Sequence, residues 1–166
     1  MNSPLGHVLV VDDDADLLAS YVRLLIESGY TADGAGDGAE AIIRLISGQY
    51  DAVLTDVHMP GSGGLDVLSG VRPRDLDVPV ILMSGDPTLF SAITAVEEGA
   101  VAYLTKPIRR SRLLPLVEKA VNLGQIARAK RASLELAGVD GHLVGDRSGL
   151  RVCLDRALDT LVAAYQ

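Results

Sequence analysis

The sequence predicts an α/β protein built on a parallel sheet with helices on both faces. Between residue 7 and about residue 123, short apolar runs alternate with amphipathic helical patterns, and this alternation is typical of βα units. Four runs are almost continuously apolar, as in strands that helices cover on both sides. A fifth run, residues 31–35, is weaker and is expected at an edge. The expected strands are His7–Asp12, Thr31–Ala35, Ala52–Thr55, Val80–Met83 and Val101–Leu104.

Start and stop signals delimit the first two expected helices. An apolar stripe at helical spacing covers Leu17–Leu25, and Gly29 then suits a left-handed cap. The second helix begins with Asp37 followed three residues later by Glu40, the spacing of a capping box. This helix should end near Gly48.

The next two helices are shorter. One fits Leu65–Val71. The other begins at Asp86, a good N-cap residue, with Pro87 at the first helical position. It should run to Glu98 and stop at Gly99.

A fifth helix is expected from near Ser111, with Pro115 close enough to its start to be tolerated. Gln125–Leu136 is rich in alanine and favours a continuation of this helix. Four glycines then precede a last amphipathic helix covering Leu150–Leu161. The expected division is a domain over residues 5–123 and a helical extension over residues 124–166.

Composition and charge set limits on the function. The chain has 166 residues and a net charge of −7. Residues 1–105 carry 4 basic and 16 acidic side chains, so their net charge is −12; residues 106–166 carry 11 basic and 6 acidic, giving +5. The acidic part argues against nucleic-acid binding there and suits a cation site. The lone Cys153, and no visible secretory signal or apolar run long enough for a bilayer, favour a cytoplasmic location.

Five polar side chains follow the ends of apolar runs. Asp12 and Asp13 follow the first, Asp56 the third, Ser84 the fourth and Lys106 the fifth. The carboxyl ends of parallel strands share one edge of a sheet, where ligands bind. Three carboxylates would repel one another without a cation, and oxygen ligands of this kind suit Mg²⁺. A carboxylate held there could attack phosphorus and form a mixed anhydride.

The motifs around these residues resemble the receiver domains of bacterial two-component response regulators. The resemblance covers residues 7 to about 123 and rests on four segments: Val-Val-Asp-Asp-Asp at 10–14, Leu-Thr-Asp-Val-His-Met-Pro-Gly-Ser-Gly-Gly-Leu at 54–65, Met-Ser-Gly at 83–85 and Tyr-Leu-Thr-Lys-Pro at 103–107. It implies a doubly wound, flavodoxin-like fold with five strands in the order 2-1-3-4-5. It also implies that a histidine kinase or phosphotransfer protein is the partner.

The resemblance assigns a role to each site residue. Asp56 would be the phosphoacceptor. Asp13, Asp56 and the backbone carbonyl of His58 would bind Mg²⁺ directly, with Asp12 acting mainly through water. Lys106, followed by a cis peptide bond, would pair with the phosphoryl group. The chain would phosphorylate and dephosphorylate itself, with no independent metabolic activity expected.

Two further roles follow from the same resemblance. Ser84 and Tyr103 are expected to switch together: the hydroxyl moves to the phosphoryl group, and the aromatic ring turns inward. This change would reshape a partner-binding face and shift a pre-existing equilibrium. Asp14, in contrast, is expected to be a plain helix cap.

Other interpretations of the last third of the chain stay open. Leu154–Gln166 looks like the run-in to cyclic-di-GMP phosphodiesterase domains of the EAL family, so the chain could be the regulatory front of a longer enzyme. A helix-turn-helix is disfavoured by the glycine-spaced stretch. The long helix could also form a weak or phosphorylation-dependent homodimer through a thin apolar seam of Leu113, Val117, Ala120, Val121, Ile126 and Ala127.

Overall fold

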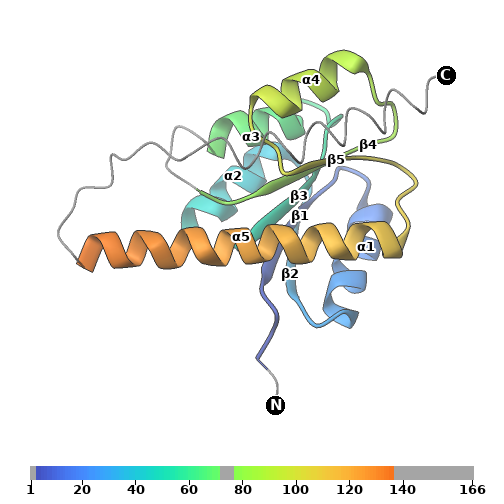
Figure 1. Ribbon diagram of the computed structural model, residues 1–166. Helices are drawn as coiled ribbons and strands as arrows, with labels where there is room; N and C mark the ends of the chain where they lie inside the picture. Colours follow the sequence, from blue (N-terminus) through green and yellow to red (C-terminus); the bar gives the residue numbers. More distant parts are fainter. Residues whose placement is uncertain (1–2, 72–76, 137–166) are drawn as a thin grey trace.

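A single parallel sheet forms the centre of the molecule (Figure 1). The structure is a computed structural model that describes residues 3–71 and 77–136. The sheet has five strands in the order β2-β1-β3-β4-β5, and all neighbouring pairs are parallel. The predicted doubly wound topology and the edge position of residues 31–35 are therefore confirmed. The strands are β1 (His7–Val11), β2 (Thr31–Ala35), β3 (Ala52–Asp56), β4 (Val80–Ser84) and β5 (Ala102–Thr105).

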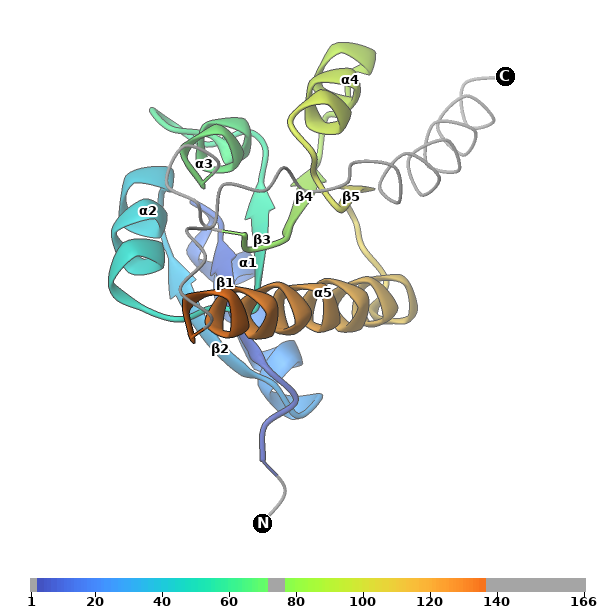
Figure 2. The ribbon, with the colours of Figure 1, turned by 60° about the vertical axis from the view of Figure 1, so that its left-hand side comes forward.

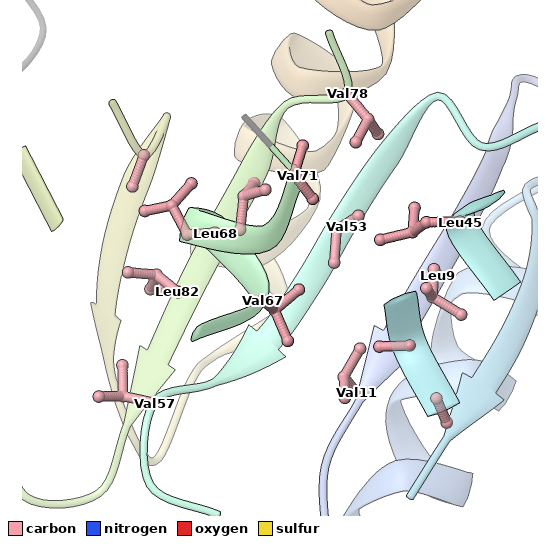
Figure 3. Close-up of a cluster of buried hydrophobic side chains, with 14 of the residues drawn as sticks. Leu9, Val11, Leu45, Val53, Val57, Val67, Leu68, Val71, Val78 and Leu82 are labelled. Carbon is pink, nitrogen blue, oxygen red and sulfur yellow. The ribbon is translucent and has the colours of Figure 1, made fainter. Parts of the chain in front are cut away.

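Five helices cover the two faces of the sheet. They are α1 (Ala15–Glu27), α2 (Gly38–Ser47), α3 (Gly64–Val71), α4 (Leu89–Glu97) and α5 (Arg110–Leu136). Buried side chains of α2, α3 and α4 share one cluster with every second residue of the strands, among them Leu9, Val53 and Leu82 (Figure 3). The alternate residues, such as Val8, face α1 and α5 on the other side. This two-sided burial explains why the central strands are apolar at consecutive positions.

The caps of α1 and α2 largely follow their sequence signals. The Asp14 carboxylate accepts hydrogen bonds from the backbone amides of residues 16 and 17, as expected of an N-cap. Gly29 has a φ of 94°, a conformation that suits glycine after a helix. Asp37 accepts from the amide of Glu40, but the Glu40 carboxylate accepts from the amide of Gly36, one residue before the expected donor. The predicted capping box is thus only half formed.

The prediction for the start of α4 is wrong. The N-cap is Thr88, two residues after the expected Asp86, and Pro87 precedes the helix. The Thr88 hydroxyl accepts from the amide of Ser91 at 3.1 Å, and the Ser91 hydroxyl accepts from the amide of Thr88 at 3.2 Å. This reciprocal pair satisfies two amides at once, which a lone Asp86 cap could not do.

Helix α5 continues without a break to Leu136, as the alanine-rich composition predicts, and Pro115 lies within it. The four apolar residues proposed for a dimer seam, Leu113, Val117, Ala120 and Val121, are buried against the sheet. They belong to the core, so this part of the seam is unavailable to a second copy. The helix expected over 150–161 lies outside the described residues. Among the described helices, none is long and apolar enough to cross a membrane.

Candidate functional site

The site lies at the carboxyl ends of the strands, where the sequence predicts it. Asp12 follows β1, Asp56 ends β3, Ser84 ends β4 and Lys106 follows β5. The structure brings one carboxylate oxygen each from Asp12, Asp13 and Asp56 within 4.8 Å of one another. Asp12 and Asp56 are 1% and 6% exposed, whereas Asp13 is open to solvent. The cluster is thus deep on one side and accessible on the other.

Lys106 joins the carboxylates although it lies 94 residues from Asp12 in the sequence. Its Nζ donates to Asp12 Oδ2 at 2.8 Å and lies 3.3 Å from Asp56 Oδ1. The backbone amide of Lys106 donates to the carbonyl of Ser84 at 2.7 Å, which ties the end of β4 to the segment after β5. The peptide bond between Lys106 and Pro107 is cis, as the resemblance predicts.

The backbone holds Asp12 in a fixed orientation. Its Oδ1 accepts from the amide of Asp14 at 3.0 Å, while its other oxygen faces Lys106. Asp14 itself caps α1, so the same turn that starts the helix also orients the buried carboxylate. Each oxygen of Asp12 therefore has a donor, which is consistent with an indirect role in cation binding.

The electrostatics of the cluster favour an added cation. Three carboxylates and one ammonium have a formal charge of −2. Burial raises the pKa of Asp56; the Lys106 charge opposes this, and the charges of Asp12 and Asp13 add to it. Burial alone would lower the pKa of Lys106, but the hydrogen bond and charges of its acidic partners raise it overall. An ionised Asp56 is thus costly here until further positive charge arrives.

The loop after β3 passes very close to the strand it leaves. Gly61 has a φ of 79°, and a Cβ atom at Gly64 would collide with the backbone carbonyl oxygen of Asp56. The amide of Gly64 donates to the carbonyl of Val57 at 3.1 Å. Glycine at position 64 therefore lets α3 start against the end of β3 and helps to position Asp56.

The two predicted switch residues have different hydrogen-bond partners in this structure. Ser84 is fully buried, and its Oγ accepts from the amide of Asp86 at 3.1 Å. Tyr103 is half-buried, and its hydroxyl lies 2.9 Å from Ser91 Oγ on α4. The contact of Ser91 with Tyr103 was not predicted, because it joins residues of two different elements. The spacing of Thr88 and Ser91 could have indicated only their capping pair.

His58 is exposed, and its side chain points to the neighbouring loop. Its Nε2 lies 3.2 Å from the backbone carbonyl oxygen of Asp86, which joins the loops that follow β3 and β4. Among the described residues, the side chains clustered closely enough to hold a metal ion are those of Asp12, Asp13 and Asp56. The role of the His58 backbone carbonyl as a magnesium ligand stays a prediction.

Comparisons with known proteins agree with this geometry. The family model of the response regulator receiver domain matches residues 8–118. A crystal structure of a receiver domain protein from Methanospirillum hungatei has the same fold, with a TM-score of 0.69 and 23% identity over 73% of this chain and 97% of that one. Response regulator TrrA from Thermotoga maritima, in complex with Mg²⁺-BeF, is 32% identical with a TM-score of 0.61, and the match covers 71% of this chain and 98% of that one.

Curated relatives show where this chain corresponds to larger proteins. Transcriptional regulatory protein PrrA from Mycobacterium tuberculosis is 34% identical over 86% of this chain and 61% of its own length. DNA-binding transcriptional regulator NtrC from Escherichia coli is 33% identical over 88% of this chain and 31% of its own length. The chain therefore spans less than two thirds of these relatives. With the motif order, the fold, the acidic cluster and the family match in agreement, the chain belongs to the response regulator receiver domains, which act in phosphorylation-dependent signalling.

Proposed function

We propose that this chain accepts a phosphoryl group on Asp56 from a histidine kinase or phosphotransfer protein and switches a partner-binding face in response. The observation that supports this most strongly is the contact of Lys106 Nζ with Asp12 and Asp56 at 2.8 and 3.3 Å, beside the open Asp13 carboxylate. The Lys106 ammonium can offset the negative charge of a transferring phosphoryl group, while the Asp56 carboxylate keeps an oxygen that can attack phosphorus.

The transfer itself needs few groups from the protein. A carboxylate oxygen of Asp56 forms the new P–O bond as the P–N bond of the donor phosphohistidine breaks. The histidine nitrogen leaves with the electron pair of that bond and takes up a proton. Lys106, already beside Asp56, pairs with the phosphoryl oxygens.

We infer that Mg²⁺ belongs to this site. The donor set fits the ion, because three clustered carboxylates carry more negative charge than Lys106 balances and hard oxygen ligands suit Mg²⁺. Asp13 and Asp56 would hold it directly together with the His58 backbone carbonyl, and Asp12 would act mainly through water. When bound, Mg²⁺ supplies positive charge that stabilises the phosphoryl oxygens.

We propose that Ser84 and Tyr103 carry the signal away from Asp56. The Ser84 hydroxyl, which now accepts from the Asp86 amide, would rotate to donate to a phosphoryl oxygen. The Tyr103 hydroxyl bonds to Ser91, so movement of the ring would act directly on the first turn of α4. Phosphorylation would then alter the surface around α4 by favouring one of two existing arrangements.

The output of the signal is also a proposal. PrrA and NtrC are called transcriptional regulators, and this chain matches only part of each. For this chain we propose an output delivered by an attached or separate domain. The alternative, the front of a cyclic-di-GMP phosphodiesterase, rests on residues 154–166, which lie outside the described residues; a native coding sequence that stops after Gln166 would remove it.

Acetyl phosphate with Mg²⁺ provides the direct test. Intact-protein mass spectrometry should find one base-labile phosphoryl adduct on the wild type and on Asp16→Asn, an exposed aspartate of α1. The adduct should be absent from Asp56→Asn. An adduct on Asp56→Asn, or one that forms equally well in EDTA, would contradict the proposal.

A further inference from the structure

The last part of α5 extends beyond the stretch that the receiver family model matches. That match ends at residue 118, whereas α5 runs to Leu136. We call residues 124–136 the α5 arm. Figure 2 shows the arm continuing straight across the molecule toward the side of α2. The sequence predicts that these residues lie outside the domain. In the structure, however, they make several contacts with the segments that precede the strands.

Two glycines let α5 approach these strand ends closely. Gly124 is buried, and a Cβ atom there would collide with the backbone carbonyl oxygen of Asp51, the residue before β3. A Cβ atom at Gly6, the residue before β1, would collide with Cγ1 of Val121. A helix that left the domain after residue 123 would not need the glycine at position 124. Gly124 is therefore the position where the arm packs directly against the backbone at the amino end of β3.

A buried carboxylate anchors the next turn of the arm. Asp51 is 4% exposed, and its Oδ2 accepts from the amide of His7 at 2.8 Å. Its Oδ1 has no aligned hydrogen-bond donor among the described residues, but Arg128 Nη2 lies 2.5 Å from it. A buried carboxylate is costly without a partner, and Arg128 supplies the opposite charge. The arm thus completes the surroundings of a charge that belongs to the receiver core.

Two further contacts of the arm are also polar. Gln125 Nε2 donates to the carbonyl of Leu5 at 3.0 Å, and Arg131 Nη2 lies 2.7 Å from Asp77 Oδ2. After Gly124 no described residue of the arm is buried. A cavity of about 340 Å³ separates the arm from the end of α2 and is lined in part by Leu45 and Ala132. Ion pairs and hydrogen bonds, rather than apolar packing, therefore hold the arm after its first turn.

We propose that the α5 arm is an integral part of the receiver fold, locked to the sheet edge by the Arg128–Asp51 pair. The domain then includes residues 124–136 rather than ending at residue 123, and this part of α5 has a fixed direction relative to the sheet. Strand β3 begins one residue after Asp51 and ends with Asp56, so one strand connects the anchor of the arm to the predicted phosphoacceptor. The proposal does not depend on phosphorylation or on Mg²⁺.

Amide hydrogen exchange of the full chain tests the lock. In the wild type, arm amides should be protected nearly as well as those of residues 113–121. Arg128→Gln should make the arm amides exchange about tenfold faster while residues 113–121 keep their protection. Lys130→Gln, an exposed change on the same arm, should leave exchange unchanged. Unprotected arm amides in the wild type, or equal exchange in Arg128→Gln and Lys130→Gln, would overturn the proposal.

Gly124→Ala provides a test of opposite sign. In a free helix, alanine is the better helix former, and this change would increase protection of the arm. In a docked arm the new methyl group collides with the Asp51 carbonyl, so protection should fall. Ala129→Gly, at an exposed position of the arm, reports the effect of helix propensity alone. Greater protection in Gly124→Ala would show a free helix and refute the docked arm.

Discussion

Replacing Asp56 by Asn should stabilise this protein in the absence of divalent cations. Burial raises the pKa of Asp56, which means that the folded state disfavours the ionised carboxylate. Asn has nearly the same shape and carries no charge. The substitution removes the predicted phosphoacceptor, yet we expect the folded state to gain free energy relative to the unfolded state.

The size of this gain follows from opposing charges around Asp56. At 3.3 Å, attraction to Lys106 amounts to about 5 kcal/mol with an effective dielectric constant of about 20. Repulsion from the buried Asp12, at separations up to 4.8 Å, is at least about 3.5 kcal/mol on the same basis. The exposed Asp13 adds less because water screens it. These charges nearly offset one another, so burial decides, and the expected net gain is about 1 kcal/mol.

Urea unfolding at neutral pH in EDTA and then in Mg²⁺ measures the effect. In EDTA, Asp56→Asn should unfold at higher urea than the wild type, and the control Asp16→Asn should not. In Mg²⁺ at about ten times its dissociation constant, the wild type should gain about 1.4 kcal/mol and Asp56→Asn much less. The advantage of Asn should shrink as the pH falls through the raised pKa of Asp56. A destabilised Asp56→Asn in EDTA would refute this account of the site.

Three further substitutions probe the lysine of the site, a hydrogen-bonded carboxylate of β2 and the N-cap of α4. Lys106→Met leaves two buried carboxylates without their cation and should cost about 2–3 kcal/mol in urea unfolding; a cost equal to that of the exposed Lys130→Met would contradict this. The pKa of Asp33 is lowered, because hydrogen bonds from neighbouring side chains outweigh its burial. The ionised Asp33 therefore stabilises the fold above its ordinary pKa of 3.8. The wild type should melt at a higher temperature than Asp33→Asn above this pH, and the difference should disappear as the pH falls below it. Thr88→Ala removes the acceptor of the Ser91 amide and should cost about 1 kcal/mol by calorimetry, whereas Thr88→Ser should cost much less.

Local signals in the sequence were enough to predict the sheet and most helix boundaries. Apolar runs of four to five residues mark strands because both faces of this sheet are buried. Asp14 and Gly29 act as predicted because a cap interacts only with the helix turn beside it. The predicted N-cap of α4 was wrong because Asp86 and Thr88 are both good N-cap residues, and the sequence alone does not choose between them. The reciprocal bond of Thr88 with Ser91, visible only in the folded chain, decides between them.

The convergence of the acidic cluster was also predictable from the sequence. Parallel strands place their carboxyl ends on one edge, so the topology alone brings Asp12, Asp56 and Lys106 together. The sequence by itself thus determined the strand order, through its family resemblance, and which side chains gather at the candidate site. Only the tertiary structure decided which groups pair across elements: Tyr103 with Ser91, and Asp51 with Arg128. Such pairs depend on how helices and strands pack in three dimensions, and no local pattern of residues encodes these distances.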